Sequence, residues 1–183
     1  MLAVLLGVAY LLLAMRERIA CWYAAFVSTA IYLWLFWQVG LLMESALQVY
    51  YLLMAVYGWY SWRGGVQQDT VLRISTWPLR RHLLVIGGVL LLSSVSGALL
   101  AHYTQARLPY LDSFTTWGSL VTTWMVARKL LENWLYWVCI DSLSIYLYLD
   151  RELYLTALLF ALYVVIVIFG FIEWLRHYRT QIQ

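Results

Sequence analysis

The run LLENWLYWVCID, residues 130–141, carries polar and aromatic side chains at a four-residue spacing. Asn133, Trp137 and Asp141 are each four positions apart, so on an α-helix they share one face. An amide, an indole and a carboxylate together suit a small polar ligand with an aromatic ring, especially a cation, because a tryptophan ring attracts a desolvated cation by about 2 kcal/mol. Trp134 lies close to the same face. The alternative is structural: Asp141 pairs with a buried partner or caps a neighbouring helix, and the tryptophans only pack.

Residues 44–62 contain the polar side chains best placed to face this stripe. Glu44, Gln48 and Tyr51 occupy positions i, i+4 and i+7 and so lie on one side of a helix. Gln48 is the only amide well inside the segment. It either contacts the ligand or hydrogen-bonds another helix. Glu44 is near the end of the segment and is expected at an interface with water.

Residues 111–127 carry a third polar stripe, within the sequence LDSFTTWGSLVTTW. Its members are Asp112, Thr115, Thr116, Ser119, Thr122 and Thr123. Serine and threonine in apolar helices often hydrogen-bond their own backbone or allow close helix packing, and that role is favoured for any single one of them. Taken together, the stripe predicts an aqueous path, and Ser119 is included in the predicted ligand site.

The composition places these elements in a membrane. Of 183 residues, 64% are hydrophobic and only 11% are charged. A bilayer can solvate that much apolar surface, whereas a single soluble core could not bury it. The basic residues behind the net charge of +3 are spread over the loops, where they indicate membrane topology. No nucleic-acid partner is therefore expected.

Enzyme and cofactor classes find no support in the sequence. We recognise no nucleophile–base pair, metal-ligating cluster or phosphate-binding loop, so no catalytic residue, cofactor or metal is expected. Cys21 and Cys139 are far apart in apolar surroundings, which argues against a disulfide or a zinc site. His82, His102 and His177 fall near segment ends, so the paired intramembrane histidines of a haem cytochrome are missing.

Apolar runs predict seven transmembrane helices, since about 20 residues cross the hydrocarbon core and shorter spans are tolerated. They are residues 2–15, 19–39, 44–62, 83–103, 111–127, 131–149 and 153–175. No basic region precedes residue 2 and no small-residue cleavage site follows residue 15, so the first run is expected to stay as a helix. The chain then divides into a three-helix unit at 1–62, a cytoplasmic loop at 63–82, a linker helix at 83–103, a second three-helix unit at 111–175 and a cytoplasmic tail at 176–183.

Lys and Arg cluster on one side of this topology. Ten of the twelve fall in the connections after the first, third and fifth helices and in the C-terminal tail: Arg16, Arg18, Arg63, Arg73, Arg80, Arg81, Arg128, Lys129, Arg176 and Arg179. The other side has only Arg107 and Arg151. The positive-inside rule therefore places the N-terminus outside and the C-terminus in the cytoplasm.

Two groups of identities indicate an internal repeat. Ser28, Ile31, Tyr32, Leu33 and Leu35 match Ser142, Ile145, Tyr146, Leu147 and Leu149 at an offset of 114. Leu41, Tyr51, Gly58 and Trp62 match Leu153, Tyr163, Gly170 and Trp174 at an offset of 112. The two three-helix units have the same predicted orientation, so a single linker helix must join them. A parallel 3+1+3 repeat of this kind, as in the SWEET transporters, places a substrate site near the midplane between the halves.

Four motifs in this order resemble the PnuC family of bacterial vitamin transporters. They are LQVYYLLMAVYGWYSW, LDSFTT, RKLLENWLYW and LYLTALL, and the resemblance covers nearly the whole chain. It implies an all-α integral membrane protein of the cytoplasmic (inner) membrane with a SWEET-like 3+1+3 bundle, often a homotrimer. It also implies uptake of nicotinamide riboside, a cationic pyridinium, by facilitated diffusion, with a cytoplasmic kinase phosphorylating the imported product so that it cannot return.

The resemblance also implies a binding region. Gln48 and Tyr51 in the first of these motifs, and Asn133, Trp134 and Trp137 in the third, match it. Asp141 departs from it, because many nicotinamide riboside transporters resemble this pattern with Asn there, and many have a longer N-terminus.

Several hypotheses follow. In the first, the chain is a uniporter for nicotinamide riboside whose halves rock about Gln48, Asn133, Trp137 and Asp141. Relatives sometimes called PnuT transport thiamine, which is also a cationic aromatic compound. Asp141 could instead bind a proton, in which case uptake should rise with an inward proton gradient. A purely structural membrane subunit is the remoter alternative.

Overall fold

The structure is a computed structural model of residues 1–183. It describes all of them except 39, 41, 68–71, 106 and 183, and also leaves the side chains of 42, 43 and 64–67 undescribed. The described chain forms seven α-helices: α1 (Leu2–Met15), α2 (Ala20–Gln38), α3 (Leu42–Gln67), α4 (Leu79–Tyr103), α5 (Pro109–Ala127), α6 (Asn133–Asp150) and α7 (Tyr154–Ile182). The prediction of an all-α chain with seven helices is confirmed.

Some helix ends differ from those expected from hydropathy. Helix α3 continues to Gln67 instead of ending at 62, α4 begins at Leu79 directly after Pro78, and α7 continues to Ile182 instead of ending at 175. Hydropathy marks only the apolar part of a helix, whereas backbone hydrogen bonding continues into polar sequence such as RHYRTQI. The connection expected at 63–82 is therefore helical at both ends, and the expected tail is helical through Ile182.

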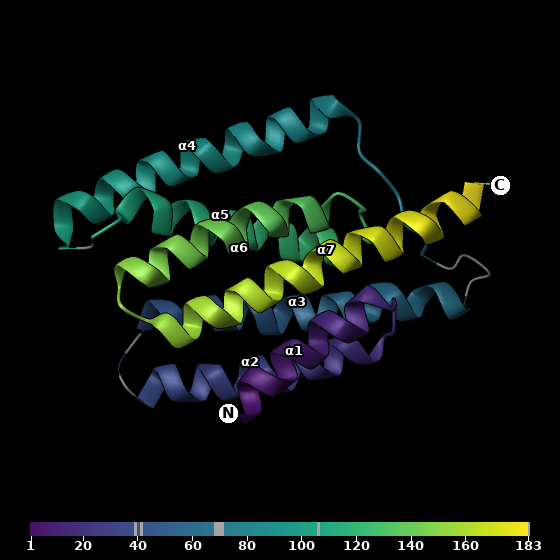
Figure 1. The fold of residues 1–183 in the computed structure, drawn as a ribbon, viewed down its shortest axis with the longest axis horizontal. Helices are drawn as coiled ribbons and strands as arrows, with labels where there is room; N and C mark the ends of the chain where they lie inside the picture. Colours follow the sequence, from purple (N-terminus) through teal and green to yellow (C-terminus); the bar gives the residue numbers. More distant parts are fainter. Residues whose placement is uncertain (39, 41, 68–71, 106, 183) are drawn as a thin grey trace.

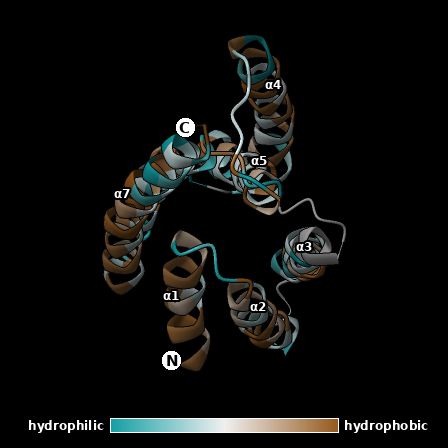
Figure 2. Cartoon of the chain, turned by 90° about the vertical axis from the view of Figure 1, so that its right-hand side faces the viewer, coloured by the Kyte–Doolittle hydropathy of each residue, from teal (hydrophilic) through white to brown (hydrophobic). Residues whose placement is uncertain are grey.

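The helices pack as two groups of three with one helix outside them. In the first group α2 contacts both α1 and α3, and in the second α6 contacts both α5 and α7. The groups meet where α1 contacts α7 and where α3 contacts α5. Helix α4 packs against α5 and lies at the periphery (Figures 1 and 2). Each group therefore presents its first and third helices to the other.

The C-terminal ends of the helices fall into two sets, which point toward opposite ends of the molecule. The last turns of α1, α3, α5 and α7 point toward one end of the molecule, and the last turns of α2, α4 and α6 point toward the other (Figure 1). This is the grouping of connections on which the predicted topology depends. Basic residues such as Arg16, Arg18, Arg128 and Lys129 therefore gather at the end that holds the C-terminus.

Three described helices are long and apolar enough to cross a membrane: α2, α4 and α7. Helix α1 is apolar but shorter. Many large apolar side chains on these helices are exposed, including Leu84 (76%) and Leu91 (65%) on α4. Only lipid or another protein could cover such a surface, so the chain is a multi-pass membrane protein.

Tryptophan contacts recur in the two groups at an offset of 112 residues. The rings of Trp22 and Trp62 meet edge to face, with centroids 5.4 Å apart and planes at 85°. The rings of Trp134 and Trp174 do the same at 5.3 Å and 86°. Edge-to-face pairs of this kind are a favoured aromatic geometry. Helices α2 and α3 therefore pack through the same contact as α6 and α7.

A glycine makes each of these contacts possible. A Cβ added to Gly58 would lie 2.3 Å from the Trp22 ring, and one added to Gly170 would lie 2.6 Å from the Trp134 ring. No real side chain tolerates such a distance, so only glycine lets the indole lie against the facing helix. The pairs again differ by 112 positions.

The offset of 114 expected between α2 and α6 is not followed by these contacts. Ser28 is buried and donates a hydrogen bond to the Ala3 carbonyl at 2.8 Å, whereas Ser142, its expected counterpart, is exposed. Helices rich in Leu and Tyr match by chance in more than one register. The packing selects 112 throughout, which pairs Trp22 with Trp134.

Two further hydrogen bonds cross between the groups. Trp62 Nε1 donates to the Ala127 carbonyl in the last turn of α5 at 3.2 Å. Trp174 Nε1 donates to the Ala14 carbonyl in the last turn of α1 at 3.1 Å. Each tryptophan of a third helix thus bonds a backbone carbonyl in the last turn of a first helix of the other group.

Candidate functional site

A cavity of about 160 Å³ lies between the two groups of helices. Five helices contribute to its wall: Gly7 and Tyr10 from α1, Trp22, Ala25, Ser28 and Thr29 from α2, Tyr51 and Ala55 from α3, Thr123 from α5 and Trp137 from α6. The wall is aromatic and small-polar, and none of these side chains carries a full charge. A space of this kind suits the ring and hydroxyl groups of a small organic molecule.

Two of the predicted site residues line this cavity, and a third supports them. Tyr51 and Trp137 reach it from opposite groups of helices. Ser119 on α5 lies near enough to the Tyr51 hydroxyl to interact with it. The structure therefore brings α3, α5 and α6 together at the residues that the sequence singled out on each of them.

Asp141 lies one turn beyond Trp137, at the middle of α6, and is 4% exposed. It is near enough for its charge to act on the hydroxyls of Tyr51, Tyr148 and Tyr163. No ion pair among the described residues includes it. Within the described part of the chain, no three His, Cys, Asp or Glu side chains gather where they could hold a metal ion. Asp141 is thus an isolated acidic group beside an otherwise neutral wall.

Asn133 and Trp134 lie at the start of α6 and outside the cavity wall. The Asn133 side chain is fully buried, and its Nδ2 donates to the Leu130 carbonyl at 2.6 Å, which leaves Oδ1 without a partner among the described residues. Trp134 is 1% exposed and packs against Gly170 and Trp174. Its position is that of a core residue.

Gln48 is also outside the cavity wall. It lies partly buried on α3, one turn before Tyr51, while Glu44 at the start of that helix is exposed as expected. The Gln48 amide is therefore on the helical turn next to Tyr51, which lines the cavity. It is not among the groups that enclose the cavity in this conformation.

Three of the six side chains in the polar stripe of α5 hydrogen-bond to their own helix. Thr115, Thr122 and Thr123 donate to the carbonyls three or four residues earlier, at 3.0, 2.7 and 2.8 Å. Asp112 is held at the end of the helix by Arg151 at 2.9 Å. Of the stripe, only Thr123 lines the cavity, and the continuous aqueous path expected from the number of hydroxyls stays a prediction.

Sequence reasoning missed the part of the wall that comes from α1 and α2. Gly7 and Tyr10 stand on an apolar helix without any charged neighbour, and nothing in their types predicts a cavity. Trp22 and Thr29 could have been found from the repeat, since the offset of 112 pairs them with Trp134 and Asp141.

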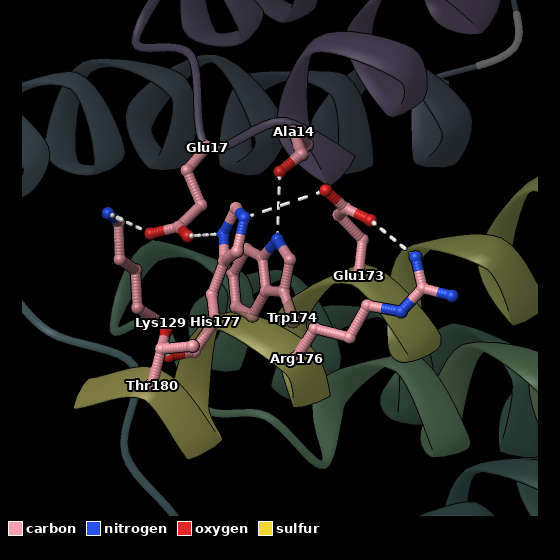
Figure 3. Close-up of polar contacts among 8 residues, drawn as sticks. All are labelled: Ala14, Glu17, Lys129, Glu173, Trp174, Arg176, His177 and Thr180. Carbon is pink, nitrogen blue, oxygen red and sulfur yellow. Dashed lines mark hydrogen bonds and ion pairs between the residues drawn. The ribbon is translucent and has the colours of Figure 1, made fainter. Parts of the chain in front are cut away.

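A second polar cluster closes the end of the bundle that holds the C-terminus (Figure 3). Lys129 Nζ donates to Glu17 Oε2 at 2.7 Å, and His177 Nδ1 lies 2.7 Å from Glu17 Oε1. His177 Nε2 also lies 3.5 Å from Glu173 on the same helix. Burial by itself would raise the pKa of Glu17, but the hydrogen bonds and charges of Lys129 and His177 outweigh it and hold the pKa below its ordinary value. The cluster ties the α1–α2 connection to the α5–α6 connection and to α7.

The backbone around Glu17 and Lys129 is alike. Both are non-glycine residues with positive φ, 52° and 50°, one residue after the C-cap of α1 and of α5. Lys129 additionally lies over the Trp62 ring at 4.8 Å from its centroid. Strained backbone of this kind persists where surrounding contacts hold it. Here the ion pair and the ring supply those contacts.

Comparison with known proteins agrees with this geometry. The fold matches the crystal structure of the vitamin B3 transporter PnuC with a TM-score of 0.77 and 21% sequence identity, covering 98% of this chain and 81% of that one. No curated protein matches the chain significantly. A family model described as nicotinamide mononucleotide transporter matches residues 1–176. Its members are transporters and not enzymes, and because the match spans nearly the whole sequence, this chain belongs to the nicotinamide mononucleotide transporter family.

Proposed function

We propose that the protein carries nicotinamide riboside across the membrane by facilitated diffusion. The observation behind this is the cavity between the two groups of helices, with Trp137 and Tyr51 in its wall and the Asp141 carboxyl one turn away. A pyridinium ring can stack on the indole, and its positive charge is then near the carboxylate. The ribose hydroxyls find partners in Ser28, Thr29 and Thr123 of the wall.

The charge of the site favours a substrate without phosphate. The ten residues of the wall include no Lys or Arg, and phosphate groups are normally held by such residues. A nucleotide would bring negative charge next to Asp141 without any basic partner. The riboside fits better than the mononucleotide in the family's name, because it is cationic and lacks that phosphate.

Thiamine is the second candidate, favoured by the same carboxylate. It is also a cationic aromatic compound, so it could stack on Trp137 and pair its charge with Asp141 in the same way. The ribose separates the two candidates, since thiamine has no ring of hydroxyls to pair with the polar part of the wall. A non-transporting structural subunit is not favoured by any contact of the cavity.

Transport requires that the two groups of helices move relative to each other. The contact pattern at an offset of 112 supports a parallel 3+1+3 repeat of the SWEET type, with residues 1–62 and 111–175 as the halves and α4 as the linker. About 160 Å³ is less than the roughly 300–1,000 Å³ of a typical ligand site, so loading must widen the cavity. Separation of Glu17 from Lys129 would open the end that holds the C-terminus.

The cellular setting belongs to the same proposal. The basic end of the bundle faces the cytoplasm by the positive-inside rule, which puts the C-terminus inside and the N-terminus outside the bacterial inner membrane. The family resemblance suggests a homotrimer and a cytoplasmic kinase that phosphorylates the imported substrate. Phosphorylation would trap it, since the cavity has no group to bind a phosphate.

Quenching of tryptophan fluorescence tests the substrate. The purified protein is titrated in parallel with nicotinamide riboside, nicotinamide mononucleotide and thiamine. We expect saturable quenching by the riboside, lost in Trp137→Phe and retained in Trp37→Phe, a matched control whose ring is 64% exposed on α2. Saturation by thiamine alone would reassign the substrate. No response to any of the three would overturn the proposal.

A further inference from the structure

We propose that Asp141 and Tyr163 select the uncharged carboxamide that the substrate carries on its cationic ring, and that Asp141 excludes a carboxylate at the same place. The amide N–H donates to the Asp141 carboxylate, and the Tyr163 hydroxyl donates to the amide oxygen. This inference rests on the proposed function, because the carboxamide is the ring substituent of nicotinamide riboside. It adds which substituent the site accepts and which chemical relative it rejects.

Neither of these two side chains is committed to another part of the protein. Asp141 is 4% exposed at the middle of α6, and no hydrogen bond or ion pair among the described residues includes its carboxylate. The Tyr163 hydroxyl on α7 has no hydrogen-bond partner among the described residues either. Buried polar groups in native proteins are normally paired. An acceptor and a donor left open beside a cavity therefore indicate where a ligand completes the hydrogen bonding.

Tyr163 reaches the edge of the cavity where α7 packs against α1. Its hydroxyl lies 3.0 Å from the position that a Cβ on Gly7 would occupy, and Gly7 lines the cavity. The ring is held from the other side by Phe160, at 5.4 Å between the two centroids. Asp141 is near enough for its charge to act on the Tyr163 hydroxyl. The acceptor on α6 and the donor on α7 are thus neighbours at one edge of the cavity.

Tyr163 is also the counterpart of Tyr51 in the proposed repeat. The two tyrosines are 112 positions apart, which is the spacing of the glycine–tryptophan contacts. Tyr51 lines the cavity from the first group of helices, and the charge of Asp141 acts on both hydroxyls. Because loading must widen the cavity, we expect Tyr163 to join its wall from the second group as Tyr51 does from the first.

A carboxamide satisfies this pair of groups. It presents an N–H donor and a carbonyl acceptor side by side, and these match a carboxylate and a phenol hydroxyl. Trp137 lines the cavity one turn before Asp141, so a ring stacked on the indole has its edge near the carboxylate. A hydrogen bond to an ionised acceptor is roughly twice as strong as one between neutral groups. The Asp141 contact therefore contributes more to the affinity than the Tyr163 contact.

A carboxylate on the same ring would meet Asp141 with no cation between the two charges. The ten residues of the cavity wall include no Lys or Arg. Arg151, at the C-cap of α6, pairs with Asp112 at 2.9 Å, and Lys129 pairs with Glu17 at 2.7 Å. Like charges brought together in a buried site repel each other strongly. Nicotinic acid riboside, which differs from nicotinamide riboside only in this group, should therefore be excluded.

Binding of three ribosides to the purified wild type tests the proposal without any variant. The probes are nicotinamide riboside, nicotinic acid riboside and 3-acetylpyridine riboside, which keeps the carbonyl but has a methyl group in place of the NH2. We expect the acetyl compound to bind about tenfold more weakly than the amide, through loss of a bond to a charged group. The acid should bind about a hundredfold more weakly, or less, through charge repulsion. Equal binding of acid and amide would overturn the proposal and leave the proposed function intact, whereas no binding of any riboside would count against the proposed function.

Substitutions separate the two roles. Asp141→Asn removes the repelling charge, so the acid and the amide should then bind within about tenfold of each other. Tyr163→Phe should weaken amide binding by about three- to tenfold, the value of a neutral hydrogen bond, while the acid stays excluded. Tyr146→Phe, at a residue that is 59% exposed on α6, is the matched control and should bind as the wild type does. An Asp141→Asn variant that still excludes the acid would overturn the role of Asp141, and unchanged amide binding in Tyr163→Phe would overturn that of Tyr163.

Gly7 tests where the Tyr163 hydroxyl lies. An alanine at this position would place its Cβ 3.0 Å from the hydroxyl oxygen, so Gly7→Ala should displace the hydroxyl and weaken amide binding as Tyr163→Phe does. The double variant should bind no more weakly than Tyr163→Phe alone, because a phenylalanine has no hydroxyl to displace. Losses that add in the double variant would show that the hydroxyl does not act from this position, and would overturn its role in selection.

Discussion

Glu17 and Lys129 lie 112 residues apart, the spacing that also separates Trp22 from Trp134 and Gly58 from Gly170, and they bind each other at 2.7 Å. In the proposed repeat, an axis that relates the two groups of helices would pass close to this ion pair. Apart from their charge the two positions are alike, since both follow a helix C-cap with positive φ. The two opposite charges join the α1–α2 connection to the α5–α6 connection.

Reversal of one charge should break this ion pair, and exchange of both should restore it. Glu17→Lys places two cations where the ion pair was, and breaking a largely buried pair costs on the order of 3 kcal/mol. We expect a lower melting temperature in detergent and reduced substrate uptake. The double variant Glu17→Lys, Lys129→Glu should recover much of both. Arg176→Glu is the control, because its contact with Glu173 is long (3.8 Å) and exposed and such pairs contribute little. A double variant no better than either single variant would show that the pair has no such role.

The same cluster predicts an effect of acid on stability. The folded protein lowers the pKa of Glu17 below its ordinary value of 4.5, so the carboxylate stabilises the fold at any pH above that value. This contribution is lost as pH falls below 4.5 and passes through the lowered pKa. Melting temperatures from pH 7 down to pH 3 should therefore fall more steeply at the acid end for the wild type than for Glu17→Gln. Parallel curves for the two proteins would contradict the assignment.

The glycine–tryptophan contacts predict matched losses in the two halves. An alanine at Gly58 or Gly170 would place its Cβ 2.3 or 2.6 Å from an indole ring, and overpacking of this kind costs about 1–3 kcal/mol or more. Both variants should melt at lower temperature by similar amounts. Gly88→Ala is the control, since nothing lies within 4 Å of its Cβ on α4 and alanine favours a helix. A melting temperature for Gly58→Ala equal to that of Gly88→Ala would refute the packing.

The number and the order of the helices could be predicted because a long apolar run in the sequence indicates a membrane helix. Their ends could not, because hydropathy stops at the edge of the apolar run while helical hydrogen bonding continues, as in α7. The repeat stays a prediction. Gly58 and Gly170, which identity pairs at an offset of 112, make the same kind of contact with a tryptophan. Ser28 and Ser142, which identity pairs at an offset of 114, differ in burial, because a residue match ignores which side of the helix is buried.

The candidate site was predicted where polar side chains share a helix face with the cavity and missed where apolar side chains form it. Spacing alone brought Trp137 and Asp141 together on α6. Trp137 lines the cavity, whereas Trp134 packs in the core. Spacing could not distinguish these roles, because side chains three positions apart on a helix differ in direction by only about 60°. Only the packing partner, Gly170, decides that difference.

Substitution of these two tryptophans should therefore have different effects. Trp134→Phe removes part of a ring that is 1% exposed against Gly170 and Trp174, so it should lower the melting temperature and leave riboside quenching saturable. Trp137→Phe changes the cavity wall and should abolish quenching with little loss of stability. The two measurements on the same preparations give the comparison. Loss of quenching in Trp134→Phe at an unchanged melting temperature would place Trp134 at the substrate instead.

The segment between α3 and α4 is attached to the connection that carries Lys129. Ser75 donates its backbone N–H to the Lys129 carbonyl at 3.1 Å and accepts from Leu131 N–H at 2.9 Å, and Trp77 N–H donates to Glu132 Oε1 at 2.9 Å. Ile74, beside this bridge, is 3% exposed in the core. The segment therefore holds the backbone of Lys129, whereas Glu17 holds its side chain.

Proline at position 75 should loosen this attachment. Ser75→Pro removes the N–H that binds the Lys129 carbonyl, and an unpaired carbonyl costs about 1–3 kcal/mol where water cannot reach it. Ser75→Ala keeps the backbone donor and changes only an exposed side chain, so it should behave as the wild type. We expect Ser75→Pro to melt at lower temperature and to be cleaved faster by protease between residues 72 and 78. Because the Lys129 backbone would then be held less firmly, combining Ser75→Pro with Glu17→Gln should cost less than the sum of the single effects, and strict additivity would show that the two attachments act independently.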